Sequence, residues 1–179
     1  MITVTKLGKH IGASITDVDL SKPLDDNTFA QVREAFFDNE VVVFPGQKLT
    51  PPQQIAFTQR FGPLEHHVRK EARLAEHPEI FILSNKVNDQ GQAIGAQDAG
   101  RFWHSDLSYK THPSLLSALY AIEIPVKDGK PLGDTRFASS TAAYNALPEA
   151  MKQKLAGLKN IHSYRDYRIK NYAAQQEDM

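Results

Sequence analysis

Apolar residues recur at helical spacing in the first third of the chain. Between about residues 26 and 38 they fall on one helical face, as Phe29, Val32, Phe36 and Phe37. Asp25 or Asp26 can cap the start of this helix, because a side-chain oxygen there can accept from the free amides of the first turn. The pattern therefore predicts an amphipathic helix that packs its aromatic face onto a core.

A second helix is indicated after Thr50. Thr50 can act as the N-cap, Pro51 is tolerated at the first helical position, and Gln53 can complete a capping box. Ile55, Phe57 and Phe61 continue the apolar pattern until Gly62-Pro63 ends it. We expect this helix to lie close to the first, with its aromatic residues in the same core.

Short apolar runs bounded by glycine and proline predict strands elsewhere. Residues 85–100 are polar and glycine-bearing and predict a long loop, a class of segment that often carries function. Together the elements predict a mainly β core with flanking helices. The expected strands lie within 1–20, 41–44 (buried), 80–83, 115–124, 134–137 and 161–164, and further helices at about 141–146 and 148–156.

Composition narrows the function classes. The chain has 179 residues, which suits a single domain over 1–179, and its 21 Lys and Arg balance 21 Asp and Glu. This balance argues against a broad basic surface for nucleic acid. No secretory leader and no apolar run of about 20 residues is evident, so we expect a soluble cytoplasmic protein that does not bind membranes. Because cysteine is absent, a metal site would need nitrogen and oxygen ligands.

The sharpest candidate for chemistry is Trp103-His104-Ser105-Asp106. In an extended strand, residues two apart point to the same face, so the His104 imidazole and the Asp106 carboxylate can converge on one ion. With a second, distant histidine they would complete the 2-His-1-carboxylate arrangement of non-haem Fe(II) oxygenases. A His-x-Asp pair alone is weak evidence, since a surface hydrogen bond is the commoner explanation.

Further motifs accompany this pair in order along the chain. They are Leu7-Gly8, Ile11-Gly12-Ala13, Asp19-Leu20, Pro23-Leu24, Arg60-Phe61-Gly62, Gly133-Asp134-Thr135, Ala142-Ala143-Tyr144 with Leu147, and Gly157-Leu158 with His162. With these motifs the chain resembles the taurine and 2,4-dichlorophenoxyacetate dioxygenase family of Fe(II)- and 2-oxoglutarate-dependent oxygenases. The resemblance implies a double-stranded β-helix, or jelly roll, of the clavaminate synthase-like kind, incomplete in this chain.

The resemblance also implies site roles. His104 and Asp106 match the first two iron ligands, Thr135 matches a threonine that binds 2-oxoglutarate, and His67 matches a substrate-contacting histidine. The implied reaction hydroxylates a C–H bond of a small anionic substrate, such as a sulfonate or aryloxyalkanoate, and releases succinate and CO2. Nearby basic residues can face such a substrate or form a solvated surface, and the second alternative is favoured; they are Arg69, Lys70, Arg73 and Arg101. Self-association into a homo-oligomer is left open.

The family's third iron ligand and its 2-oxoglutarate arginine have no counterpart here. Only 73 residues follow Asp106, and His162, Arg165 and Arg168 come too early for those roles. We therefore expect the chain to match the N-terminal two-thirds of the family's usual extent. It can be a truncation, a part completed by another chain, or a shortened non-catalytic relative that binds or oligomerises; the first is favoured.

Overall fold

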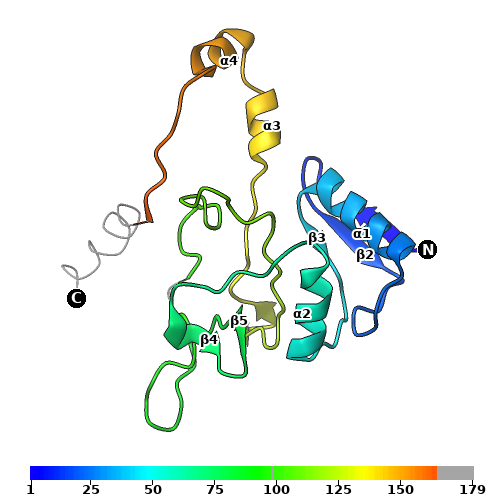
Figure 1. Ribbon diagram of the computed structural model, residues 1–179, viewed down its shortest axis with the longest axis vertical. Coiled ribbons are helices and arrows are strands. Elements are labelled where there is room, and N and C mark those ends of the chain that lie inside the picture. The colour runs from blue at the N-terminus through cyan, green and yellow to red at the C-terminus, as the bar shows by residue number, and fades with distance from the viewer. Residues whose placement is uncertain (98, 165–179) are drawn as a thin grey trace, which may run out of the picture.

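The computed structural model describes residues 1–97 and 99–164. An N-terminal layer consists of β1 (Thr3–Lys6), β2 (Ala13–Thr16) and β3 (Val42–Val43), covered by α1 (Asp26–Asn39). β1 and β2 are antiparallel with Val4 opposite Ile15, and β3 joins β2 in parallel. This layer and α2 (Pro51–Gln59) lie side by side in Figure 1. The helices and strands predicted for the first 60 residues are therefore confirmed in outline.

The core of this layer follows directly from the apolar pattern. Ile15 and Val32 are fully buried, and Ala35 lies beside them. Phe61, two residues beyond α2, meets Phe29 of α1 edge to face with ring centroids 4.8 Å apart. The aromatic face predicted for the two helices thus closes one shared core. β3 departs from the prediction of a buried strand, because it is the edge of the sheet and Val43 remains 47% exposed.

Local capping confirms the predicted helix starts. Asp25 accepts from the amide of Thr28 at 2.9 Å, and Gln53 accepts from the amide of Thr50 at 2.7 Å. These bonds satisfy amides that have no partner inside the helix.

The glycine of the Leu7-Gly8 motif has a steric role, since a Cβ at Gly8 would lie 2.6 Å from the carbonyl oxygen of Ile11.

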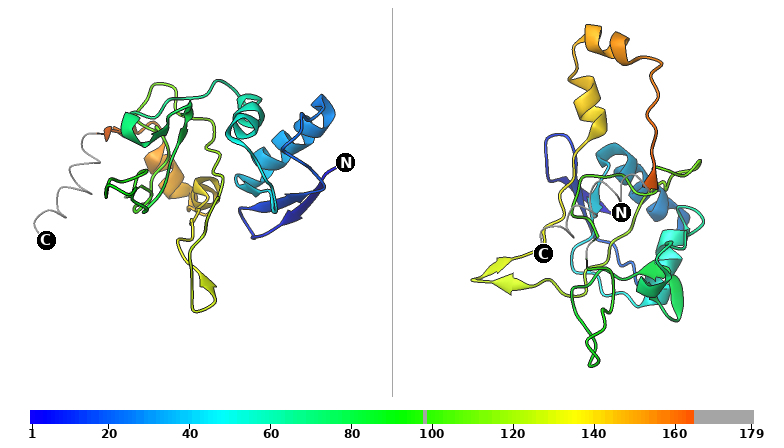
Figure 2. Two further views of the ribbon diagram at one scale, coloured as in Figure 1. Left: turned by 90° about the horizontal axis from the view of Figure 1, so that it is seen from below. Right: turned by 90° about the vertical axis from the view of Figure 1, so that its left-hand side faces the viewer.

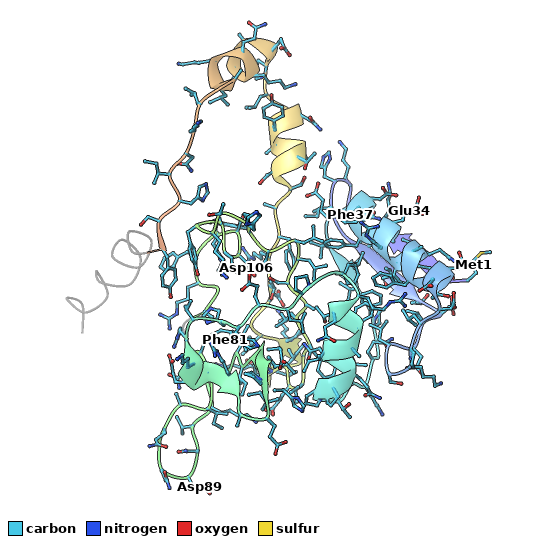
Figure 3. The ribbon with its side chains drawn as sticks, viewed as in Figure 1. Met1, Glu34, Phe37, Phe81, Asp89 and Asp106 are labelled. Atoms are coloured by element: carbon cyan, nitrogen blue, oxygen red, sulfur yellow. The ribbon has the colours of Figure 1, made fainter. Side chains whose placement is uncertain are left out.

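The middle of the chain carries smaller sheets. A one-turn helix, η1 (Lys70–Ala72), leads into β4 (Arg73–Leu74), which pairs with β5 (His77–Phe81), and α2 packs against β5. The long loop predicted at 85–100 is present, with Asp89 at its tip, and it extends to the end of the molecule remote from Asp106 (Figure 3).

The second half of the described chain is more open. β6 (Val126–Lys127) and β7 (Lys130–Pro131) form a hairpin that projects from the body in both views of Figure 2. α3 (Ser140–Asn145) and α4 (Glu149–Leu155) extend away from the rest, near the helices predicted there. None of the helices in the described part combines the length and apolar character that a bilayer crossing requires.

Three predicted strands are wrong in the described residues, because none of 115–124, 134–137 and 161–164 forms a strand. A strand exists only where a second strand supplies hydrogen-bonding partners, and alternating apolar residues cannot supply these alone. As a result, helices contribute more residues than strands, and the sheets contain two or three strands each instead of a closed jelly roll. The mainly β core expected from the sequence is therefore only partly present in residues 1–97 and 99–164.

Candidate metal centre

His104 and Asp106 meet although neither lies in a strand. Nε2 of His104 is 3.2 Å from Oδ1 of Asp106, and the two side chains are 41% and 51% exposed. Asp106 opens a turn in which the amide of Lys110 donates to the carbonyl of Leu107 at 2.9 Å. Leu107 has a φ of 51°, the left-handed region that a leucine adopts only under constraint from its surroundings. The imidazole and the carboxylate thus meet in an irregular segment that a tight turn directly follows.

The tautomer of His104 follows from its backbone contact. Nδ1 lies 2.7 Å from the carbonyl oxygen of Phe102. A carbonyl can only accept, so Nδ1 carries the hydrogen and Nε2 of a neutral ring presents its lone pair to Asp106. This Nδ1–H to carbonyl bond is the usual means of orienting a metal-binding imidazole.

The donor set of this pair suits a divalent cation. A lone pair on Nε2 facing a carboxylate oxygen is repulsive unless a proton or a metal ion lies between them. Two donors about 2.1 Å from an octahedral ion and at right angles to each other lie about 3 Å apart, close to the observed separation. Imidazole with carboxylate is a ligand pair of non-haem Fe(II). In the part of the chain that is described, no third His, Asp or Glu joins the pair.

A hydroxyl completes the surroundings of Asp106. Oγ of Ser117 donates to Oδ2, the carboxylate oxygen turned away from His104. Each oxygen of Asp106 therefore has its own partner. Nothing in the local sequence marks Ser117 for this contact, since it is eleven residues further along the chain.

His67 lies in a separate, better packed environment. Its ring stacks on Phe81 with centroids 3.8 Å apart, Nδ1 accepts from the amide of Arg69 at 3.1 Å, and Arg73 donates to its carbonyl oxygen. Burial lowers the pKa of the imidazole below its usual 6.5, and Arg69 lowers it further, while the carboxylate of Asp106 raises it. The His67 ring is therefore held between the ring of Phe81 and the backbone amide of Arg69.

An ion pair joins these two segments. Nζ of Lys110 lies 2.6 Å from Oε2 of Glu65, across 45 residues of sequence. The turn that follows Asp106 is thereby tied to the segment that carries His67. No sequence pattern predicts this bridge, because both residues have the character of ordinary surface charges.

The basic residues near His67 are engaged within the fold. Nε of Arg73 is 2.7 Å from the carbonyl oxygen of His67, and Nε of Arg69 is 3.1 Å from Oε1 of Glu71. Arg73 thus helps to hold the His67 segment, a role that neither alternative included, whereas Arg69 forms a local ion pair with the exposed Glu71.

Thr135 and His162 stand apart from the pair. Thr135 is exposed in the irregular stretch between β7 and α3, and among the described residues no hydrogen bond joins it to His104 or Asp106. His162 is exposed, with Nε2 3.3 Å from Nδ2 of Asn160. Arg165 and Arg168 lie outside the described residues.

Comparison with known proteins identifies relatives along nearly the whole chain. Pentalenolactone F synthase of Streptomyces avermitilis is 31% identical over 160 residues, which are 88% of this chain and 51% of that enzyme. The alpha-ketoglutarate-dependent 2,4-dichlorophenoxyacetate dioxygenase of Cupriavidus pinatubonensis is 33% identical over 171 residues, 90% of this chain and 58% of that enzyme. The chain spans about half the length of the curated relatives that it matches.

A solved structure supports the same relationship. A crystal structure from Burkholderia xenovorans, described as an alpha-ketoglutarate-dependent taurine dioxygenase, superposes with a TM-score of 0.73 at 28% identity. The match covers 92% of this chain and 54% of that one. The family model for the taurine catabolism dioxygenase TauD, TfdA family matches residues 3–178. The chain therefore belongs to the TauD/TfdA family of taurine catabolism dioxygenases.

Proposed function

We propose that this chain carries part of the active site of an Fe(II)- and 2-oxoglutarate-dependent dioxygenase that hydroxylates a small anionic substrate. The observation that carries the proposal is the 3.2 Å approach of Nε2 of His104 to Oδ1 of Asp106, in a chain that belongs to the TauD/TfdA family. In this proposal the described strands and helices form one portion of a double-stranded β-helix over a single domain, and the protein acts in the cytoplasm.

The two ligands are prepared for this role before a metal binds. The carbonyl of Phe102 fixes the His104 tautomer, so that the Nε2 lone pair is free to bind. Asp106 supplies a negative charge, which favours retention of a dication. When bound, Fe(II) with 2-oxoglutarate and O2 supplies the oxidation, in which a substrate C–H becomes C–OH while 2-oxoglutarate becomes succinate and CO2.

Two further residues are assigned to the cosubstrate and the substrate. We assign Thr135 to the carboxylate of 2-oxoglutarate, for which its exposed hydroxyl is a suitable donor. We assign His67 to the substrate, because its ring is held by Phe81 and the Lys110–Glu65 ion pair ties its segment to the turn after Asp106. A sulfonate or aryloxyalkanoate fits this assignment, since an imidazole N–H can donate to either anion.

Metal binding gives the direct test. Co(II) should quench the fluorescence of Trp103, the chain's single tryptophan, which directly precedes His104. We expect His104→Ala to abolish saturable quenching, because only one protein donor of the pair would remain. His112→Ala, which removes an exposed histidine from the same segment, is the matched control and should bind as the unsubstituted chain does. Equal binding by His104→Ala would remove the ligand assignment.

A non-catalytic binding or oligomerisation module is the second candidate. It is favoured by large apolar side chains in contact with solvent, of which Ile122 and Ile161 are each 90% exposed. Succinate release from 2-oxoglutarate with Fe(II), ascorbate and a panel of sulfonates and aryloxyalkanoates separates the two functions. Turnover that His104→Ala abolishes supports the enzyme. Concentration-dependent association with no metal binding supports the module.

A further inference from the structure

We infer that Ser117 is a positioning residue for the metal centre, acting through the carboxylate of Asp106. This inference rests on the proposed function, because a hydrogen bond to Asp106 can affect metal binding only if Asp106 is a metal ligand. The two carboxylate oxygens of Asp106 are divided between two partners: Oδ1 faces His104, and Oδ2 accepts from the hydroxyl of Ser117.

This division fixes how the carboxylate is presented. An aspartate side chain can rotate and exchange its two oxygens, and each arrangement places negative charge differently with respect to the imidazole. A donor on Oδ2 favours the orientation in which Oδ1 points at Nε2 of His104. The loss of orientational freedom then occurs on folding and not on metal binding, which raises affinity.

The segment that carries Ser117 is anchored to other parts of the fold. The segment that carries Ser117 continues to Tyr120, whose phenolic oxygen accepts from the amide of Leu49 at 3.0 Å. Leu49 directly precedes Thr50, the residue that caps α2. Further on, Nζ of Lys86 pairs with Glu123. These two contacts tie the segment that follows Ser117 to the start of α2 and to the 85–100 loop, although that segment has no regular secondary structure.

The hydrogen bond between Ser117 and Asp106 should affect metal binding more than folding. Ser117 and Asp106 are both exposed, so a hydrogen bond between them adds little to folding stability. Outer groups that hydrogen-bond to metal ligands nevertheless change metal affinity by about 10- to 100-fold. Affinity for a metal and stability of the metal-free chain should therefore respond differently to the loss of this hydroxyl.

The experiment compares Mn(II) affinity, measured from the electron paramagnetic resonance signal of free Mn(II), across matched variants of the full chain. We expect Ser117→Ala to weaken binding about tenfold, and Ser117→Thr, which keeps the hydroxyl, to restore most of it. Ser114→Ala is the control, because its side chain makes no hydrogen bond within the described residues of the same segment. The thermal midpoint of the metal-free chain should be the same for all four proteins.

The outcomes separate this inference from the proposed function. If the unsubstituted chain binds Mn(II) and Ser117→Ala binds it equally well, the positioning role is overturned while the ligand pair stands. If Ser117→Ala lowers the thermal midpoint of the metal-free chain in proportion to its loss of affinity, the serine is structural and the inference fails. If the unsubstituted chain binds no Mn(II), the ligand assignment fails and the inference falls with it.

Discussion

The imidazole of His67 shows how packing sets the chemistry of one residue. The ring of Phe81 covers one of its faces, and the amide of Arg69 donates to Nδ1, so the charged form loses hydration without gaining an acceptor at that nitrogen. Burial is the largest cause of its lowered pKa. The folded chain therefore favours neutral His67.

This preference makes stability depend on pH. As the pH falls below 6.5, the usual pKa of histidine, the unfolded chain takes up a proton that folded His67 resists. The free energy of unfolding should therefore decrease until the pH passes the lowered pKa of the folded state, and then level off. Urea titrations of the unsubstituted chain and of His67→Gln across this range measure the difference. A difference that does not change with pH would contradict the shift.

At the scale of elements, β2 and α1 hold the N-terminal core through Ile15. Ile15 is fully buried against Val32, whereas its neighbour across the strand pair, Val4, is 43% exposed. We expect Ile15→Ala to lower the free energy of unfolding by about 2–5 kcal/mol, because it removes buried carbons and leaves a cavity. Val4→Ala is the matched control on the other strand and should cost less than about 1 kcal/mol. Chemical denaturation measures both, and equal losses would contradict this placement of the core.

Arg60 joins the two N-terminal helices. Its guanidinium lies 4.1 Å from the ring centroid of Phe29, donates to the carbonyl of Leu24, and pairs with Asp26 at 2.6 Å. These contacts lie at the start of α1 and give the Arg60-Phe61-Gly62 motif a structural role.

Loss of these contacts should loosen the packing of α2 on α1. We expect Arg60→Ala to lower the free energy of unfolding by about 1–2 kcal/mol, the sum expected for one cation–π contact and one or two hydrogen bonds. Arg33→Ala is the control, since its guanidinium lies 5.2 Å from the ring of the half-exposed Phe37. Thermal unfolding followed by circular dichroism measures both. An equal or larger effect of Arg33→Ala would show that the inter-helix contact adds no stability.

Across the whole molecule, burial is concentrated near the N-terminus. Of the eight buried apolar residues in the described chain, six lie between Ala13 and Ala35, while Ile122 and Leu158 remain 90% and 69% exposed. α3 and α4 extend from the body without a covering layer (Figure 1). Local stability should therefore fall from the N-terminal layer toward the second half of the chain.

Hydrogen exchange can measure this gradient. We expect the amides of β2 and α1 to exchange slowest, since they are paired within a buried layer, and those of 115–124 to exchange fastest among the residues compared. Mass spectrometry of exchanged peptides provides the rates. Strong protection over 115–124 would show that this segment has a partner in solution, as the strand pattern of its sequence predicts.

The candidate site was only partly accessible to sequence reasoning. The donor types at His104 and Asp106 are visible in the sequence, and their spacing suggested convergence through a strand. In the structure the two side chains meet in an irregular segment, followed by a left-handed Leu107 that residue identity does not favour. Thr135 and His67 were proposed from resemblance, and their roles stay predictions.

The sequence by itself determined the features that depend on neighbouring residues. Caps at Asp25 and Thr50 and the spacing of aromatic residues suffice for α1 and α2, because helix signals are local. Tertiary structure alone decided the contacts between distant segments, such as Lys110 with Glu65 and Ser117 with Asp106. It also decided that 115–124 is not a strand, since strand pairing requires a partner that no local pattern can specify.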